Sequence, residues 1–146
     1  MRAVDTNVLI YSFFADSPFH ATAKATVDAL AVSPAPWAIP WPCIHEFYAV
    51  VTNPKIFRDA SLALAARAQI AEWMRSPTLQ LLSEASDHWP TLNRLIEQSS
   101  LVGPAVHDAR IAAICLSYRV DELLTLDRDF SRFPQLTVVS ILDSAG

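Results

Sequence analysis

The sequence predicts an α/β fold, a three-layer α/β/α sandwich around a central parallel sheet of about five strands. Short apolar runs alternate with longer helical patterns along the 146 residues, and 52 % of the residues are hydrophobic while 18 % are charged. Strands that alternate with helices form parallel sheets that are covered on both faces. A chain of this length fits one domain, which we expect over residues 1–146.

The first half of the chain predicts two strands and three helices. Thr6 and Asn7 can cap the first helix, Pro18 suits an early turn of the second, and Pro42 suits the start of the third. The expected strands are "RAVD" (2–5) and "WAIPW" (37–41), and the expected helices are "NVLIYSFF" (7–14), "SPFHATAKATVDALAV" (17–32) and "PCIHEFYAVVTN" (42–53).

The second half continues the alternation with three helices and three strands. Ser61 begins one helix, a Ser-Asp capping pair opens the next, and Pro104 marks the start of the last. The expected helices are "SLALAARAQIAEWMRS" (61–76), "SDHWPTLNRLIEQSS" (86–100) and "GPAVHDARIAAICLSYRV" (103–120), and the expected strands are "TLQLLS" (78–83), "DELLTLD" (121–127) and "LTVVSI" (136–141).

Four acidic residues are expected at the carboxyl edge of this sheet, where ligands of open α/β sheets bind. Asp5 and Asp127 each end a predicted strand, and Glu46 and Asp108 lie in early turns of helices that start at the same edge. Right-handed crossovers fix these helix directions, so distance along the chain is no obstacle to contact. We therefore expect the four carboxylates to converge.

Converging carboxylates need a counter-charge. Two of them about 4 Å apart repel by roughly 4 kcal/mol at an effective dielectric near 20. The only lysines, Lys24 and Lys55, do not adjoin the acids in sequence. Mg²⁺ or Mn²⁺ takes oxygen ligands and is usually held by a few carboxylates together with substrate phosphate. A single such acid is usually a cap or exposed, but four on one edge favour a metal site.

Composition excludes several classes of protein. Two glycines leave no room for a Gly-rich phosphate loop, and Cys43 and Cys115 are too few for a disulfide framework, so we expect buried free thiols. No apolar run approaches the ~18 residues of a membrane helix, and no secretory signal is apparent, so we expect a cytoplasmic protein.

Four motifs together resemble one family. The stretches "VDTNVLI", "HEFYAVVTNPKIF", "HDARIAAICLSYRV" and "LLTLDRDF" are similar, in order and spacing, to those of PIN-domain ribonucleases, in particular the VapC-type toxins of bacterial toxin–antitoxin pairs. The resemblance implies the strand order 3-2-1-4-5 and a Mg²⁺-dependent endoribonuclease. In it Asp5, Glu46, Asp108 and Asp127 bind the metal and are catalytic, and a metal-activated water attacks phosphorus. The stretch "DRD" contains two acids, Asp127 and Asp129, and we expect Asp129 to assist Asp127 at the same site.

Further residues are candidates around this site. The four acids carry the whole formal charge of −4, so a bound cation would leave a crevice open to phosphate. We expect the tryptophans to pack in the core and His107 to be partly exposed. We expect contacts that orient the metal-binding carboxylates from Thr6, Asn7, Thr125 and Asp129. We expect contacts to the RNA from Arg94, Arg110, Arg128 and Arg132, with Lys55 and Arg58.

The resemblance also implies partners: an antitoxin that docks near the first helices, a second copy of the chain, and RNA. The apolar exposed faces of segments 11–19 and 61–73 are candidates for these protein–protein surfaces. Three alternatives stay open. They are a PIN-domain nuclease of RNA maturation or quality control, a phosphoacceptor receiver domain, which normally needs a lysine that "LLTLD" lacks, and a catalytically silent binding module.

Overall fold

The computed structural model, which describes residues 1–126 and 128–143, has a five-stranded parallel sheet in the predicted order β3-β2-β1-β4-β5. The strands are β1 (Arg2–Val4), β2 (Trp37–Pro40), β3 (Leu79–Leu82), β4 (Glu122–Thr125) and β5 (Val138–Ser140). The helices are α1 (Thr6–Phe13), α2 (His20–Val32), α3 (Trp41–Val51), α4 (Ser61–Met74), α5 (His88–Ser99) and α6 (Val106–Ser117), with short 3₁₀ turns η1 (Gly103–Ala105) and η2 (Arg128–Arg132).

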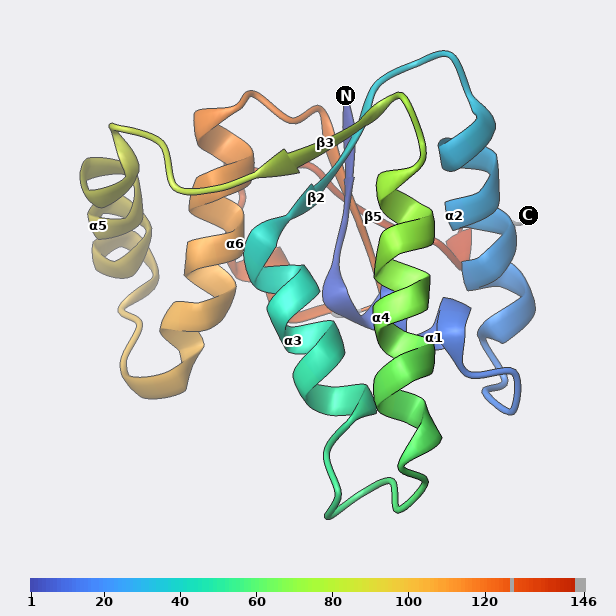
Figure 1. The fold of residues 1–146 in the computed structure, drawn as a ribbon. Helices are drawn as coiled ribbons and strands as arrows, with labels where there is room; N and C mark the ends of the chain where they lie inside the picture. The colour runs from blue at the N-terminus through green and yellow to red at the C-terminus, as the bar shows by residue number, and fades with distance from the viewer. Residues whose placement is uncertain (127, 144–146) are drawn as a thin grey trace.

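Helices lie on both sides of the sheet, as predicted. Figure 1 shows α5 and α6 on one side and α1, α2 and α4 on the other. The core lies between these layers: all four residues of β2 are buried, and so is the run 111–115 of α6. A strand buried on both faces reads as a continuous apolar run, as β2 does, whereas the edge strands β3 and β5 are only partly buried.

The central strand β1 positions the carboxyl edge. It pairs in parallel with β2 through Ala3 and Ala38 and with β4 through Val4 and Leu124. The backbone N–H of Asp5 then donates to the carbonyl of Leu124 at 3.0 Å. Asp5 therefore leaves the sheet between the ends of its two neighbouring strands.

The first two helices begin differently from the prediction. The N-cap of α1 is Asp5, whose carboxylate accepts from the N–H of Thr6, so the proposed capping by Thr6 or Asn7 is wrong. A carboxylate is an equally good cap, and both later side chains have partners elsewhere. The second helix begins only at His20, so Pro18 lies in the preceding turn.

The last two helices also begin differently. Asp87 precedes α5 without a side-chain capping bond, and its Oδ1 instead accepts from the hydroxyl of Ser117 at 2.8 Å, joining α5 to the end of α6. Pro104 lies in η1, and the α-helix starts two residues later at Val106.

One expectation from composition is confirmed. Cys43 and Cys115 are both buried and free. Across residues 1–126 and 128–143, no helix has the length and apolar character needed to cross a membrane.

Candidate active site

Asp5 is the centre of the carboxyl edge. It is buried, with 3 % of its surface exposed. Its Oδ1 accepts from the backbone N–H of Thr6 at 2.8 Å, and its Oδ2 accepts from the hydroxyl of Thr125 at 2.7 Å. A buried carboxylate is tolerated only when its oxygens are hydrogen-bonded or neutralised. These two donors therefore hold a negative charge at a fixed place between β1 and β4.

Thr6 connects Asp5 to the second predicted acid. Because α3 starts directly after β2, Glu46 in its second turn lies beside the start of α1. The hydroxyl of Thr6 donates to Oε2 of Glu46 at 2.7 Å, while its backbone N–H serves Asp5. One residue thus orients two carboxylates that are 41 positions apart in the chain.

Thr125 and Asn7 form a second link. The amide nitrogen of Asn7 donates to the hydroxyl of Thr125 at 3.3 Å, and its Oδ1 accepts from the backbone N–H of Leu126 at 3.1 Å. The Thr125 hydroxyl accepts from Asn7 and donates to Asp5. This chain of bonds fixes the end of β4 against α1 and leaves both Asp5 oxygens with defined donors.

Cys43 is a contact of Asp5 that sequence reasoning did not assign to the site. Its buried thiol donates to Asp5 Oδ1 at 3.9 Å. Burial raises the pKa of the Cys43 thiol well above its usual range, and the negative charge of Asp5 raises it further, so the group stays protonated. Cys43 precedes Glu46 by three residues and shares its face of α3, which was the available signal.

Asp108 lies in the first turn of α6 and is half-buried. Cys115 lies seven residues after Asp108, two turns along the same face of the helix. Burial raises the pKa of its thiol, and the negative charge of Asp5 raises it further, to about 12.

The described residues contain only part of the predicted quartet. Asp127 lies outside them, and for Arg128 and Asp129 only the backbone is described, as part of η2. Within residues 1–126 and 128–143 no three His, Cys, Asp or Glu side chains form a group that could hold a metal ion, so Asp5, Glu46 and Asp108 do not form one by themselves. The side chains of Asp5, Glu46 and Asp108 offer carboxylate oxygens, the ligand type that Mg²⁺ and Mn²⁺ prefer.

The predicted basic residues differ in their environment. Arg110 is paired with Glu84 through Nη2 at 2.5 Å, which leaves little of its charge for a phosphate. The pKa of Glu84 is lowered first by its own backbone N–H and then by Arg110. The Arg132 guanidinium lies 6.0 Å from the centre of the Phe133 ring. Arg94, Lys55 and Arg58 are exposed.

The aromatic residues correct one prediction. Trp73 is buried and Trp41 is half-buried, but Trp89 at the start of α5 is 64 % exposed and does not belong to the core. His107 is exposed, in agreement with the prediction.

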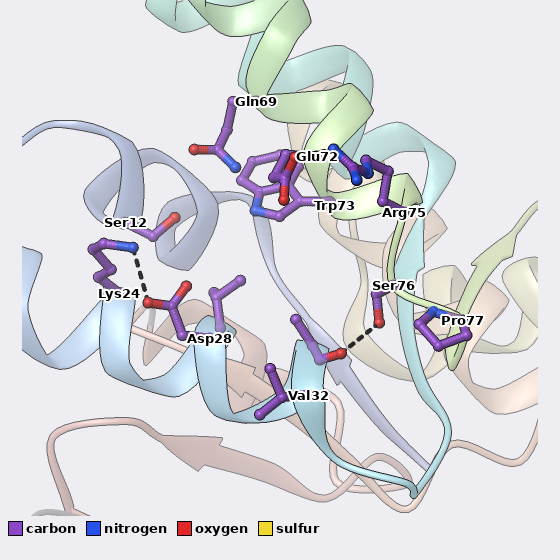
Figure 2. A pocket seen from close by; sticks show the side chains of 12 residues that line it. Ser12, Lys24, Asp28, Val32, Gln69, Glu72, Trp73, Arg75, Ser76 and Pro77 are labelled. Carbon is purple, nitrogen blue, oxygen red and sulfur yellow. Dashed lines mark hydrogen bonds and ion pairs between the residues drawn. The ribbon is translucent and has the colours of Figure 1, made fainter.

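A groove of about 650 Å³ lies on the other side of the molecule, between α1, α2 and the end of α4. Figure 2 shows Ser12 of α1, Asp28 of α2 and Trp73 of α4 around it. Two ion pairs lie along it, Lys24 with Asp28 at 2.8 Å and Glu72 with Arg75 at 3.5 Å. The groove thus joins the segments 11–19 and 61–73 that the sequence proposed as a partner surface.

Three comparisons place the chain among known proteins. It is 26 % identical over 134 residues to Ribonuclease VapC48 of Mycobacterium tuberculosis, with 92 % of each chain covered. It is 29 % identical over 136 residues to Ribonuclease VapC43 of the same organism, covering 93 % of this chain and 92 % of that one. Its fold is similar to a chain of a toxin–antitoxin complex from Klebsiella pneumoniae, with a TM-score of 0.63 and 23 % identity over 97 % of this chain and 98 % of that chain.

One further comparison, with models of protein families, agrees with the strand order, the acidic carboxyl edge and the relatives. The profile of the PIN domain matches residues 2–136, which is most of the chain. With the edge geometry around Asp5 described above, this match identifies the chain as a member of the PIN-domain family.

Proposed function

We propose that the protein is a Mg²⁺-dependent endoribonuclease and the toxin of a toxin–antitoxin pair. The observation that carries the proposal is the buried Asp5, held by Thr6 and Thr125 at the edge where the helices that carry Glu46 and Asp108 start. Membership of the PIN-domain family and full-length similarity to proteins named ribonucleases support the same reaction class.

In the proposed reaction the protein orients the oxygen ligands of the metal ion and adds no further negative charge to them. Asp5, Glu46, Asp108 and Asp127 would hold Mg²⁺ or Mn²⁺, with Asp129 as a helper. Such a cation would lower the pKa of a bound water and stabilise negative charge on the phosphate. Thr6 keeps Glu46 turned towards Asp5, Thr125 and Asn7 keep the end of β4 in place, and the neutral Cys43 thiol adds no negative charge to the cluster.

RNA would approach this edge along basic residues. Arg94, Arg128 and Arg132 remain candidates for phosphate contacts, whereas the ion pair with Glu84 argues against Arg110. Phosphate contacts of this kind position a strand without reading its sequence.

The central experiment is the substitution Asp5→Asn. Cleavage of single-stranded RNA in Mg²⁺ is expected to be lost, since an amide oxygen carries no charge to hold a cation, and expression should no longer arrest growth. The matched control is Asp16→Asn, an exposed aspartate in the turn after α1. Full cleavage and toxicity of the Asp5 variant would remove the assignment.

For the antitoxin we propose the groove between α1, α2 and α4 as the docking site. Val27 and Trp73 give it an apolar floor, and Val32 at its rim is 85 % exposed. Its flanking ion pairs suit an amphipathic helix with charges of both signs. A homodimer and a cytoplasmic location remain part of the proposal and rest on the family resemblance.

The substitution Val32→Asp tests the groove. Binding of the protein encoded by the neighbouring reading frame should weaken at least tenfold, while RNA cleavage by the free toxin stays unchanged. The control is Leu64→Asp on α4, where a leucine of 69 % exposure lies outside the groove. Unchanged binding of the Val32 variant would exclude this surface. Light scattering of the free toxin tests the dimer.

A further inference from the structure

A second cavity, of about 550 Å³, opens beside the proposed active edge. It lies between the ends of β4 and β5 and the segment 130–136, and Thr125 forms part of its wall. The same Thr125 donates the 2.7 Å hydrogen bond to Asp5. The cavity and the acidic edge are therefore in direct contact through one residue.

The walls of this cavity carry polar and apolar surface in nearly equal amounts, and its apolar side chains belong largely to the core. They include Phe130, Phe133, Leu136 and Val138, and the first three are buried at their positions, so the cavity is built on fixed parts of the core. Its volume falls within the roughly 300–1,000 Å³ of small-molecule sites, which combine apolar walls with a few placed polar groups. A flat, largely apolar ring fits such a space.

Besides Thr125, three polar side chains line the same cavity: Ser131, Ser140 and Asp143. The ionised carboxylate of Asp143 only accepts hydrogen bonds. The hydroxyl oxygen of Ser140 accepts from the backbone N–H of Leu142 at 3.3 Å, which leaves its O–H to donate. The lining thus offers an acceptor with two oxygens together with a hydroxyl donor.

Resting on the ribonuclease function proposed above, we propose that this cavity binds an unpaired guanine base of the RNA substrate, next to the phosphate that is cleaved. Guanine presents two neighbouring donors, N1–H and N2–H₂, which match the two oxygens of a carboxylate, and its O6 and N7 accept from a hydroxyl. Sequence-specific recognition of RNA mostly uses unpaired bases that are splayed out of the strand.

The other bases fit the lining less well. Adenine and cytosine each offer one amino group to a carboxylate, and uracil offers only N3–H between two carbonyl acceptors. Carbonyl oxygens next to Asp143 would repel its charge. The cavity therefore selects guanine through Asp143 and tolerates the others through its apolar side chains.

The test measures base binding without cleavage. The ¹⁵N-labelled full chain is titrated in EDTA with GMP, IMP, AMP, CMP and UMP, which share one phosphate and differ in the base. GMP is expected to shift the backbone amides of Ser131 and Ser140 and to bind at least tenfold more tightly than UMP. IMP, which lacks the 2-amino group, should bind several-fold more weakly than GMP.

Two variants sharpen the test. Asp143→Asn should lower GMP affinity about tenfold, whereas the exposed control Asp16→Asn should leave it unchanged. Ser131→Trp should fill the cavity and remove a guanine preference from cleavage maps of random single-stranded RNA. Ser83→Trp, at an exposed serine after β3, is the control for that change.

The outcomes separate the cavity from the nuclease. Cleavage without GMP-dependent shifts at these amides would overturn the cavity assignment and leave the ribonuclease proposal standing. Guanine-selective binding by a chain that cleaves no RNA would remove the nuclease function while keeping the base site. Equal affinity for all five nucleotides, or no binding, would overturn the proposal for guanine.

Discussion

The hydroxyl of Thr6 is the most informative single group in the proposed site. It donates to Glu46 Oε2 at 2.7 Å, and the backbone N–H of the same residue donates to Asp5. The substitution Thr6→Val keeps the backbone bond, the volume and the branching of the side chain but removes the hydroxyl. It therefore isolates the contribution of one hydrogen bond to the orientation of Glu46.

The size of the effect follows from this geometry. A hydrogen bond to a charged group contributes about 1.5–3 kcal/mol. If that energy serves to hold Glu46 in a metal-binding position, its loss lowers kcat/KM or metal affinity about 10–100-fold, since each ~1.4 kcal/mol is a factor of ten. Glu46 is half-buried, so in the Thr6 variant water can take the place of the lost hydroxyl. The free energy of unfolding should therefore change by less than about 1 kcal/mol.

The assay compares cleavage of a fluorescent single-stranded RNA across a Mg²⁺ titration, with urea unfolding on the same samples. Thr91→Val is the matched control, because Thr91 on α5 is 6 % exposed and Thr6 is 8 % exposed. Wild-type cleavage and an unshifted Mg²⁺ midpoint in the Thr6 variant, beside an inactive Glu46→Gln variant, would refute the orienting role.

Three further expectations concern metal, pH and the end of β4. Millimolar Mg²⁺ or Mn²⁺ should raise the melting temperature of the wild type but not of Asp5→Asn, as binding to the native state requires; equal shifts in both would contradict the metal site. The folded pKa of Cys115, about 12, lies above its unfolded value, so stability is complete below pH ~8.5 and falls by about 1.4 kcal/mol per pH unit above it. Urea unfolding at pH 8, 9.5 and 10.5 should show a flatter decline for Cys115→Ala, and an unchanged slope would contradict the assigned pKa. Asn7→Ala removes the acceptor of the Leu126 N–H and should lower the melting temperature by several degrees, measured by calorimetry; an unchanged value would mean that water replaces the amide.

Local pattern was enough to predict the elements of this fold. Strands such as 37–40 and helices such as 61–74 show their hydrophobic period and their flanking capping or proline residues in the sequence. The predicted fold class and element boundaries were therefore close to those of the structure. Strand order came from family resemblance and agrees with the structure. Helix starts were less accurate, because several polar residues compete for one cap and only tertiary contacts decide which one is used, as at Asp5.

The sequence proposed residues for the candidate site but not the connections between them. Acids at strand ends could be recognised from sequence, whereas the bond between Thr6 and Glu46 joins residues 40 positions apart and depends on how α1 meets α3. The pairing of Arg110 with Glu84 spans 26 positions, and nothing local indicates it. Trp89 was misassigned because a tryptophan is usually placed in the core on size alone, while its helix position turns it to solvent.

The place of β1 in the middle of the sheet has a consequence for synthesis. Strand β1 is synthesised before one of its two neighbours, β4, which begins only at Glu122. Until that strand emerges, Asp5 lacks the Thr125 hydroxyl that donates to it. A nascent chain therefore lacks the contact between Asp5 and Thr125, and with it the complete edge of the proposed site, until β4 has been made.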